Sequence, residues 1–160
     1  MPEHQGFDYF YGFVAGETSQ WEPRLYENTT PIEPPLDETY HLSEDLAEKA
    51  IAWLRRHESF TPDKPFFTYM SYGATHAPHH APPEWIEKYR GKFDKGWDAV
   101  RAETLANQID KGLVPPDTEL TDRPPGVQGW DELSDDQRLV GARLMETYAG
   151  FAEHTDHHTG

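Results

Sequence analysis

Two stretches of the chain repeat their apolar residues with the period of an amphipathic helix. The first predicts a helix over Ser43–Glu58, with Ser43 as its N-cap and two acidic side chains in its first turn. The second predicts a long final helix, because Ser134 and Gln137 form a capping-box pair just before a new apolar stripe. The stripe residues are Leu46, Ala50, Trp53 and Leu54 in the first helix and Val140, Leu144, Tyr148 and Phe151 in the second. Each stripe is expected to be the packed face of its helix.

A different pattern, a short unbroken run of Phe, Tyr, Thr and Met, follows the first helix. The run Phe66–Tyr72 lies between Pro65 and Gly73, and such a run predicts a strand that is buried on both faces. A strand of this kind is usually parallel and covered by helices, so the helix and strand together predict half of an α/β crossover unit. Ligands collect beyond the carboxyl ends of the strands in such sheets. The loop that leaves this end contains His76.

The rest of the chain carries weaker patterns. A short helix is predicted from Pro83 to Tyr89, and a longer one over Trp97–Lys111, which ends at a glycine. The aromatic cluster Gly6–Gly16 fits either a short strand or a packed loop, because periodicity does not separate the two. The Pro-containing stretches Glu17–Thr39 and Val114–Leu133 are predicted to be a long surface loop and a connection.

Composition and charge narrow the classes of protein that fit. A chain of 160 residues is long enough for one domain, and its formal net charge of −15 disfavours nucleic acid and anionic membranes as partners. The chain has no cysteine, which excludes disulfides, thiolate catalysis and Cys-type zinc sites within it. We find no apolar run of membrane-spanning length and no secretion signal in the opening residues MPEHQGFDYF, and the pattern leaves the compartment of the protein open.

The predicted sheet is short of strands. Only the run Phe66–Tyr72 reads convincingly as a strand, and a buried strand without neighbours leaves two rows of unpaired backbone groups. Each such buried group costs about 1–3 kcal/mol. We therefore expect the chain to be an interior piece of a larger α/β protein, or to pair with another chain.

Several segments resemble one family of hydrolases. The segment KPFFTYMSYGATHAP, residues 64–78, resembles the part of the type I sulfatases in which KPFF, a strand, and a histidine soon followed by proline occur in that order. The segments GFDYFYGFVAGETSQWEP, NTTP, EPP and YAGFAEHTDHH are similar to the bacterial arylsulfatases of this family. The resemblance therefore covers nearly the whole chain, and the order of these segments is more specific than KPFF alone.

The resemblance implies an α/β fold like that of alkaline phosphatase, with this chain as an incomplete part: a partial central sheet with flanking helices. It also implies hydrolysis of small-molecule sulfate esters by formylglycine attack, with a calcium ion that orients the sulfate. His76 matches the family histidine that contacts the sulfate or the leaving oxygen, a role that suits an imidazole. Residues 1–160 are expected to be an interior part of one sulfatase catalytic domain that is inactive without its flanking sequence.

Important parts of the family pattern are absent from this chain. It has no C/S-x-P-x-R segment to supply formylglycine, and it lacks the GKWH-type segment, the paired N-terminal aspartates and the later DNG segment of the family. The ligands of calcium and the nucleophile are therefore expected to lie outside this chain. Lys64 does not align with the catalytic lysine of the family; it is expected to end a turn before the strand.

Three other functions fit parts of the sequence. The spacing H-x-x-H-H occurs twice, and His154, His157 and His158 would share one helix face, which fits a zinc or nickel site, although solvated or packed histidines are the commoner case. The aromatic, Pro-rich loops fit a non-catalytic module that binds an aromatic or carbohydrate ligand, with Trp21 and the connection around Trp130 as candidate rim elements. A phosphoester hydrolase of the same superfamily also fits.

Overall fold

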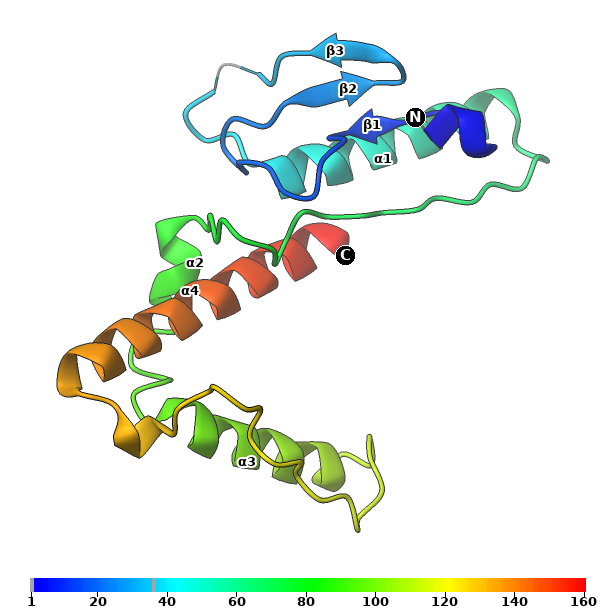
Figure 1. The fold of residues 1–160 in the computed structure, drawn as a ribbon. Helices are drawn as coiled ribbons and strands as arrows, with labels where there is room; N and C mark the ends of the chain where they lie inside the picture. Colours follow the sequence, from blue (N-terminus) through cyan, green and yellow to red (C-terminus); the bar gives the residue numbers. More distant parts are fainter. Residues whose placement is uncertain (1, 36) are drawn as a thin grey trace.

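The computed structural model describes residues 2–35 and 37–160, in which a small sheet lies on one helix and three further helices follow (Figure 1). A 3₁₀ turn precedes the sheet, and a second one precedes the last helix. The elements are η1 (Pro2–Gln5), β1 (Tyr11–Gly12), β2 (Leu25–Glu27), β3 (Thr30–Ile32), α1 (Leu42–Phe60), α2 (Pro83–Glu87), α3 (Gly96–Asp110), η2 (Trp130–Glu132) and α4 (Asp135–Thr159).

The sheet is antiparallel and lies in the part of the chain that was predicted to be mainly loop. Its order is β1-β2-β3, and β2 pairs with β3 so that Glu27 lies opposite Thr30. The two-residue connection begins with Asn28, whose φ of 53° is in the left-handed region that hairpin turns of this kind require. The surface-loop prediction for Glu17–Thr39 is therefore wrong, and the signal that could have corrected it is the asparagine between two short apolar runs.

The sheet and α1 enclose the main apolar core. Leu25, Leu42 and Leu46 are fully or almost fully buried in this core together with Tyr40. The hydroxyl groups of Tyr11 and Tyr40 both donate hydrogen bonds to Asp45, so the carboxylate is satisfied although it is buried. Burial and the neighbouring carboxylate raise the pKa of both phenols.

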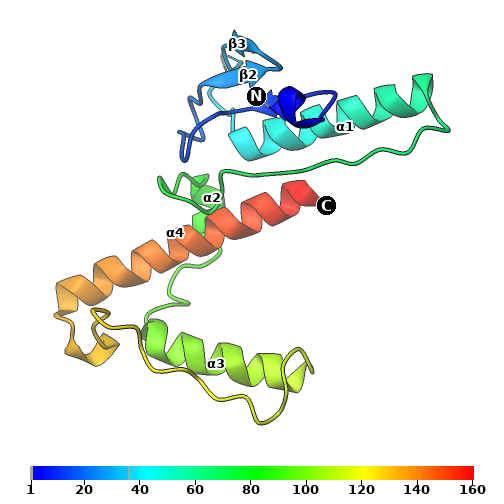
Figure 2. The same ribbon diagram turned by 45° about the vertical axis from the view of Figure 1, so that its right-hand side comes forward.

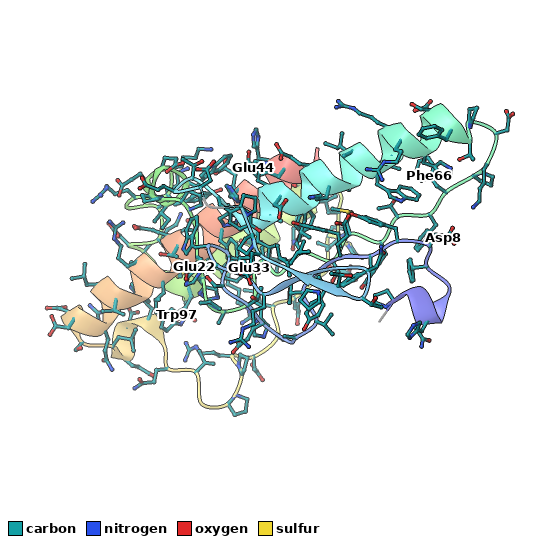
Figure 3. All side chains as sticks on the ribbon, turned by 90° about the horizontal axis from the view of Figure 1, so that it is seen from above. Asp8, Glu22, Glu33, Glu44, Phe66 and Trp97 are labelled. Atoms are coloured by element: carbon teal, nitrogen blue, oxygen red, sulfur yellow. The ribbon has the colours of Figure 1, made fainter. Side chains whose placement is uncertain are left out.

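The predicted strand Phe66–Tyr72 does not pair within the described residues. Residues 65–73 run extended beside α1, as the two ribbon views show (Figures 1 and 2), and no backbone hydrogen bond joins residues 65–72 to another described residue. Phe66, which lies beside α1 in the view from above (Figure 3), packs edge-on against Trp53 of that helix, yet it remains 57% exposed. The prediction of a strand buried on both faces is therefore wrong for this chain. A strand requires partners, and among the described residues β1, β2 and β3 pair with one another and not with residues 65–72.

The helices agree more closely with the sequence pattern. α4 begins after Ser134, which forms the predicted capping box with Gln137. α2 begins at Pro83 as predicted, and α3 covers almost all of the predicted helix. α1 begins one residue before Ser43, and its N-cap is His41, whose imidazole accepts a hydrogen bond from the Ser43 amide. The N-cap prediction for Ser43 is therefore corrected to His41.

The predicted stripe of α4 is buried only at one end. Phe151 is fully buried, whereas Val140, Leu144 and Tyr148 are about half exposed. The buried end packs against α2, where Gly150 allows the closest approach: a Cβ atom at this position would lie 2.9 Å from the backbone of Trp85 and Ile86. The same end reaches α1, where the hydroxyls of Ser43 and Thr155 are 3.2 Å apart.

α3 lies away from the sheet and is joined to the start of α4 through η2 (Figure 1). The rings of Trp97 and Trp130 pack edge-on with 4.8 Å between their centroids, and the Asp98 carboxylate accepts a hydrogen bond from the Trp130 backbone amide. Trp130 is buried in this contact, at 7% exposed, so it does not form the rim of a site as its sequence position had suggested.

Candidate functional site

His76 lies in the loop between the extended segment and α2, and its imidazole is open to solvent. The loop turns tightly, because the His76 amide donates to the Gly73 carbonyl at 3.0 Å. The His76 Nδ1 atom lies 2.7 Å from the Ala77 carbonyl oxygen, which can only accept, so Nδ1 carries the hydrogen. Nε2 therefore remains available to a ligand, and the side chain is 61% exposed.

One carboxylate faces this imidazole. Glu17, from the segment between β1 and β2, places its Oε2 atom 3.6 Å from His76 Nδ1. Both side chains are more than 60% exposed, so the pair contributes little to stability. It nevertheless places a negative charge on the Nδ1 side of the ring and leaves the Nε2 side for an anion.

The loop is attached to its surroundings at several points besides His76. The Thr75 hydroxyl donates to the Tyr148 hydroxyl of α4 at 2.7 Å, and the His79 ring packs edge-on against the Tyr148 ring with 5.5 Å between centroids. At Gly73, a Cβ atom would lie 2.9 Å from the Gln20 side-chain nitrogen, so the Gln20 side chain would have to shift to admit a larger residue. Sequence reasoning did not find Glu17, Gln20 or Tyr148, because each reaches the loop from a distant part of the chain.

Four neighbouring imidazoles form a group that we call the histidine cluster, in which two members are buried and two are half-buried: His41 and His154, and His80 and His158. His41 Nε2 donates to the His80 carbonyl at 3.1 Å, and its ring centroid is 4.2 Å from that of His154. The Nε2 atoms of His154 and His158 are 3.2 Å apart, so one donates to the other. His80 Nδ1 accepts from the Gln20 amide. Trp21 packs against His41 and His80, which makes it part of the support rather than an open rim.

Two members of the histidine cluster, His41 and His154, are held in their neutral form. Burial, with a smaller contribution from the neighbouring imidazoles, lowers the pKa of His41 to about 4 and that of His154 to about 3. His41 and His154 are only 2% and 3% exposed, and the Nδ1 atom of His154 has no hydrogen-bond partner among the described residues. Lys88 of α2 adds a positive charge that also opposes protonation of His154.

We expect the stability of the protein to fall as the pH falls below about 6.5, the ordinary pKa of histidine. Unfolding returns both imidazoles to this ordinary value, so the unfolded state binds protons that the folded state rejects until the pH reaches about 4 for His41 and about 3 for His154. The free energy of unfolding should therefore decrease by about 1.4 kcal/mol per pH unit for each of the two histidines within this window. Urea unfolding of the intact protein, followed by tryptophan fluorescence from pH 7.5 to pH 4.5, measures this slope.

A pair of variants separates these histidines from other titrating groups. His154→Phe should reduce the pH slope, whereas His4→Gln, which changes an exposed histidine of η1, should leave it unchanged. Equal slopes for His154→Phe and the unaltered protein would contradict the assignment.

The described residues do not form a metal centre. Across residues 2–35 and 37–160, no group of three or more His, Cys, Asp or Glu side chains is placed to hold a metal ion. His154 is buried and bonded to His158, and His157 instead packs against Trp85. The structure therefore gives no support to the predicted alternative of a His-rich metal site, and the same residues do not fit calcium, whose ligands were expected outside this chain.

Two hollows are lined by residues that contact or belong to the His76 loop. The larger, of about 490 Å³, is lined mainly by polar residues and includes Glu17 and Arg24. The smaller, of about 310 Å³, is almost entirely apolar and is bounded by His79 and Tyr148 together with Phe93 and Leu144. Glu17, which lines the larger hollow, lies near the His76 ring, and Tyr148, which lines the smaller one, bonds to Thr75 of the loop.

None of the described helices has the length and apolarity that a membrane crossing needs.

Comparison with known proteins identifies the family. The family model for sulfatases matches residues 1–160. An uncharacterized sulfatase of Schizosaccharomyces pombe is 32% identical over 99% of this chain, and an arylsulfatase of Klebsiella aerogenes is 25% identical over the same share. The chain spans about a third of these relatives, 31% and 36% of their lengths. These matches confirm the resemblance inferred from KPFF and the segments around it: the chain belongs to the sulfatase family.

Proposed function

We propose that the intact protein hydrolyses sulfate esters of small molecules and that His76 is the residue of this chain that contacts the sulfate or the leaving oxygen. Membership of the sulfatase family supports the reaction class. The observation that carries the role of His76 is its hydrogen bonding: Nδ1 is occupied by the Ala77 carbonyl, while Nε2 has no hydrogen-bond partner among the described residues and the side chain is 61% exposed.

This arrangement suits a general acid. As the bond between sulfur and the ester oxygen breaks, negative charge develops on the leaving oxygen. When His76 is an imidazolium, with a hydrogen on both ring nitrogens, its Nε2 proton can move to that oxygen and leave the neutral ring with its hydrogen on Nδ1. The Nδ1 hydrogen bond keeps the ring from rotating, and the Glu17 carboxylate can pair with the ring while it carries the proton. His76 is thus held in one orientation before the ester arrives, which is a condition for efficient proton transfer.

The remaining parts of the site are proposed to come from sequence outside this chain. A formylglycine nucleophile requires a Cys or Ser in C/S-x-P-x-R, which residues 1–160 do not contain. The described residues do not fit a calcium ion either. We propose that residues 1–160 are an interior part of one sulfatase catalytic domain and are inactive by themselves.

The extended segment supports the same proposal at the level of the fold. Residues 65–72 have the composition of a central strand and the backbone conformation of a strand, but their amides and carbonyls have no backbone partners in the described chain. We propose that flanking sequence of the same protein supplies the neighbouring strands of an alkaline phosphatase-like sheet. The three-stranded sheet and the helices described above would then be its peripheral α/β part.

We expect the intact protein to cleave 4-nitrophenyl sulfate in preference to 4-nitrophenyl phosphate. The two esters share their leaving group, so the ratio of their kcat/KM values reports recognition of the transferred group alone. Removing calcium with EGTA should lower turnover of the sulfate ester, and added calcium should restore it. A kcat/KM that favours the phosphate ester would contradict the proposal and assign the protein to the phosphoester hydrolases.

A further inference from the structure

We propose that Tyr148 is a positioning residue for His76, acting through Thr75. The proposal rests on the proposed function, because it concerns how the structure places the imidazole that serves the reaction. Tyr148 does not touch His76; it holds the residue immediately before it. The following contacts lead to this inference.

The contact between Tyr148 and the loop is made by two groups at once. The Thr75 hydroxyl donates to the Tyr148 hydroxyl at 2.7 Å across 73 residues of sequence. The rings of His79 and Tyr148 pack in a T-shaped arrangement, with an angle of 90° between their planes and 5.5 Å between their centroids. Tyr148 therefore contacts the loop on both sides of His76, one residue before it and three residues after it.

The helix that carries Tyr148 is itself firmly held. Gly150 lies against the backbone of α2, and Phe151 is fully buried next to His41. Glu146 is 3% exposed, and its carboxylate accepts a hydrogen bond from the Gly91 amide at 2.8 Å. Because these neighbours hold α4 in place on both sides of Tyr148 in the sequence, Tyr148 is a fixed point to which the loop can be attached.

The loop has few other attachments near His76. Its far end is tied down at His80, which bonds to Gln20 and His41, and its near end is limited by the contact of Gly73 with Gln20. Between these ends, the Thr75 hydroxyl makes the hydrogen bond that joins the loop to α4. Loss of that bond should let the loop shift, and small misplacements of a catalytic group reduce rates strongly.

We expect Tyr148→Phe in the intact protein to lower kcat for a sulfate ester by about fivefold to tenfold, with KM little changed. The size follows from the loss of one neutral hydrogen bond, since about 1.4 kcal/mol corresponds to a factor of ten in rate. The loss should be greater for an alkyl or unsubstituted phenyl sulfate than for 4-nitrophenyl sulfate, because an oxygen that leaves poorly depends more on proton donation. A purely structural role would lower the rates of all three esters by the same factor.

Variants at Thr75 test the bond from its other side. Thr75→Val removes the hydroxyl and should match Tyr148→Phe, whereas Thr75→Ser keeps it and should restore most of the rate. In the double variant Tyr148→Phe/Thr75→Val the loss should not exceed that of either single change, because both remove the same bond. Thr147→Val is the matched control: its hydroxyl donates to the Arg143 carbonyl within α4, and its rate should stay at that of the unaltered protein.

The outcomes separate this proposal from the proposed function. If His76→Ala lowers kcat but Tyr148→Phe and Thr75→Val do not, the positioning role is overturned and the role of His76 stands. If His76→Ala itself has the rate of the unaltered protein, the proposed function of His76 fails. If the Tyr148→Phe effect is equal for good and poor leaving groups, or if Thr75→Ser loses as much as Thr75→Val, the positioning role is overturned. Should Tyr148→Phe fail to fold, the Thr75 pair gives the same test.

Discussion

Replacing His76 by alanine in the intact protein is expected to lower kcat for an aryl sulfate by about 10²- to 10⁴-fold, the usual contribution of a general acid. The reason is local: Nε2 is the one ring nitrogen that the loop leaves free, and alanine offers no proton to the leaving oxygen. Steady-state kinetics with 4-nitrophenyl sulfate measure the loss. The loss should grow when the phenol is a poorer leaving group, because proton donation then matters more.

His4→Ala provides the comparison for this change. His4 is an exposed histidine in η1, so its replacement should leave kcat unchanged. Thermal unfolding of both variants shows whether the fold survives; His76 is itself exposed, and its removal should change stability little. A kcat for His76→Ala that equals that of the unaltered protein would remove His76 from the reaction.

Replacing Phe151 by alanine is expected to lower the free energy of unfolding by about 3–5 kcal/mol. Phe151 is fully buried, and its ring packs edge-on against His41 with 6.0 Å between centroids. The change would leave a cavity where α4 reaches the start of α1, and the backbone contact at Gly150 would hinder α2 and α4 from closing it. Urea unfolding at pH 7.5 measures the difference.

Phe60→Ala is the matched control for this prediction. It makes the same chemical change at the end of α1, where the ring is 81% exposed, and should alter stability by no more than about 0.5 kcal/mol. A similar loss at both positions would show that the burial of Phe151 is not what stabilises the contact between α1 and α4.

The helices were predictable because their signals are local. Ser134 and Gln137 lie three residues apart and bond to each other's backbone, so the start of α4 could be inferred from a few letters of sequence. Pro83 marks the start of α2 for a similar reason. At α1 the local signal was almost sufficient, but a histidine side chain replaced the expected serine as the cap.

The sheet was not predictable because pairing is not local. The run Phe66–Tyr72 has the composition of a strand but no partner in the described chain, whereas the shorter runs of β2 and β3 face each other across Asn28. Composition reports which segments can form strands; it does not report which segments meet. The same limit explains the α4 stripe, since periodicity identified the apolar face but not how little of it the described residues cover.

The candidate site also has a part that was predictable from local sequence and a part that was not. His76 could be identified from the segment around KPFF, because the resemblance lies in consecutive residues. Its surroundings come from elsewhere: Glu17 from the stretch predicted to be a surface loop, and Tyr148 from α4, which begins at Asp135 and where Tyr148 was interpreted only as a member of an apolar stripe. Only the three-dimensional structure shows that these residues lie near His76 and its loop.

The open segment beside α1 has a consequence for handling the protein. Residues 65–72 combine an extended backbone, unused hydrogen-bonding groups on both edges and several exposed aromatic rings. Such an edge is a template to which a second copy can add a strand, and its aromatic side chains can stack in the resulting ribbon. Preparations of the isolated 160-residue chain will therefore tend to self-associate through this stretch as the concentration rises.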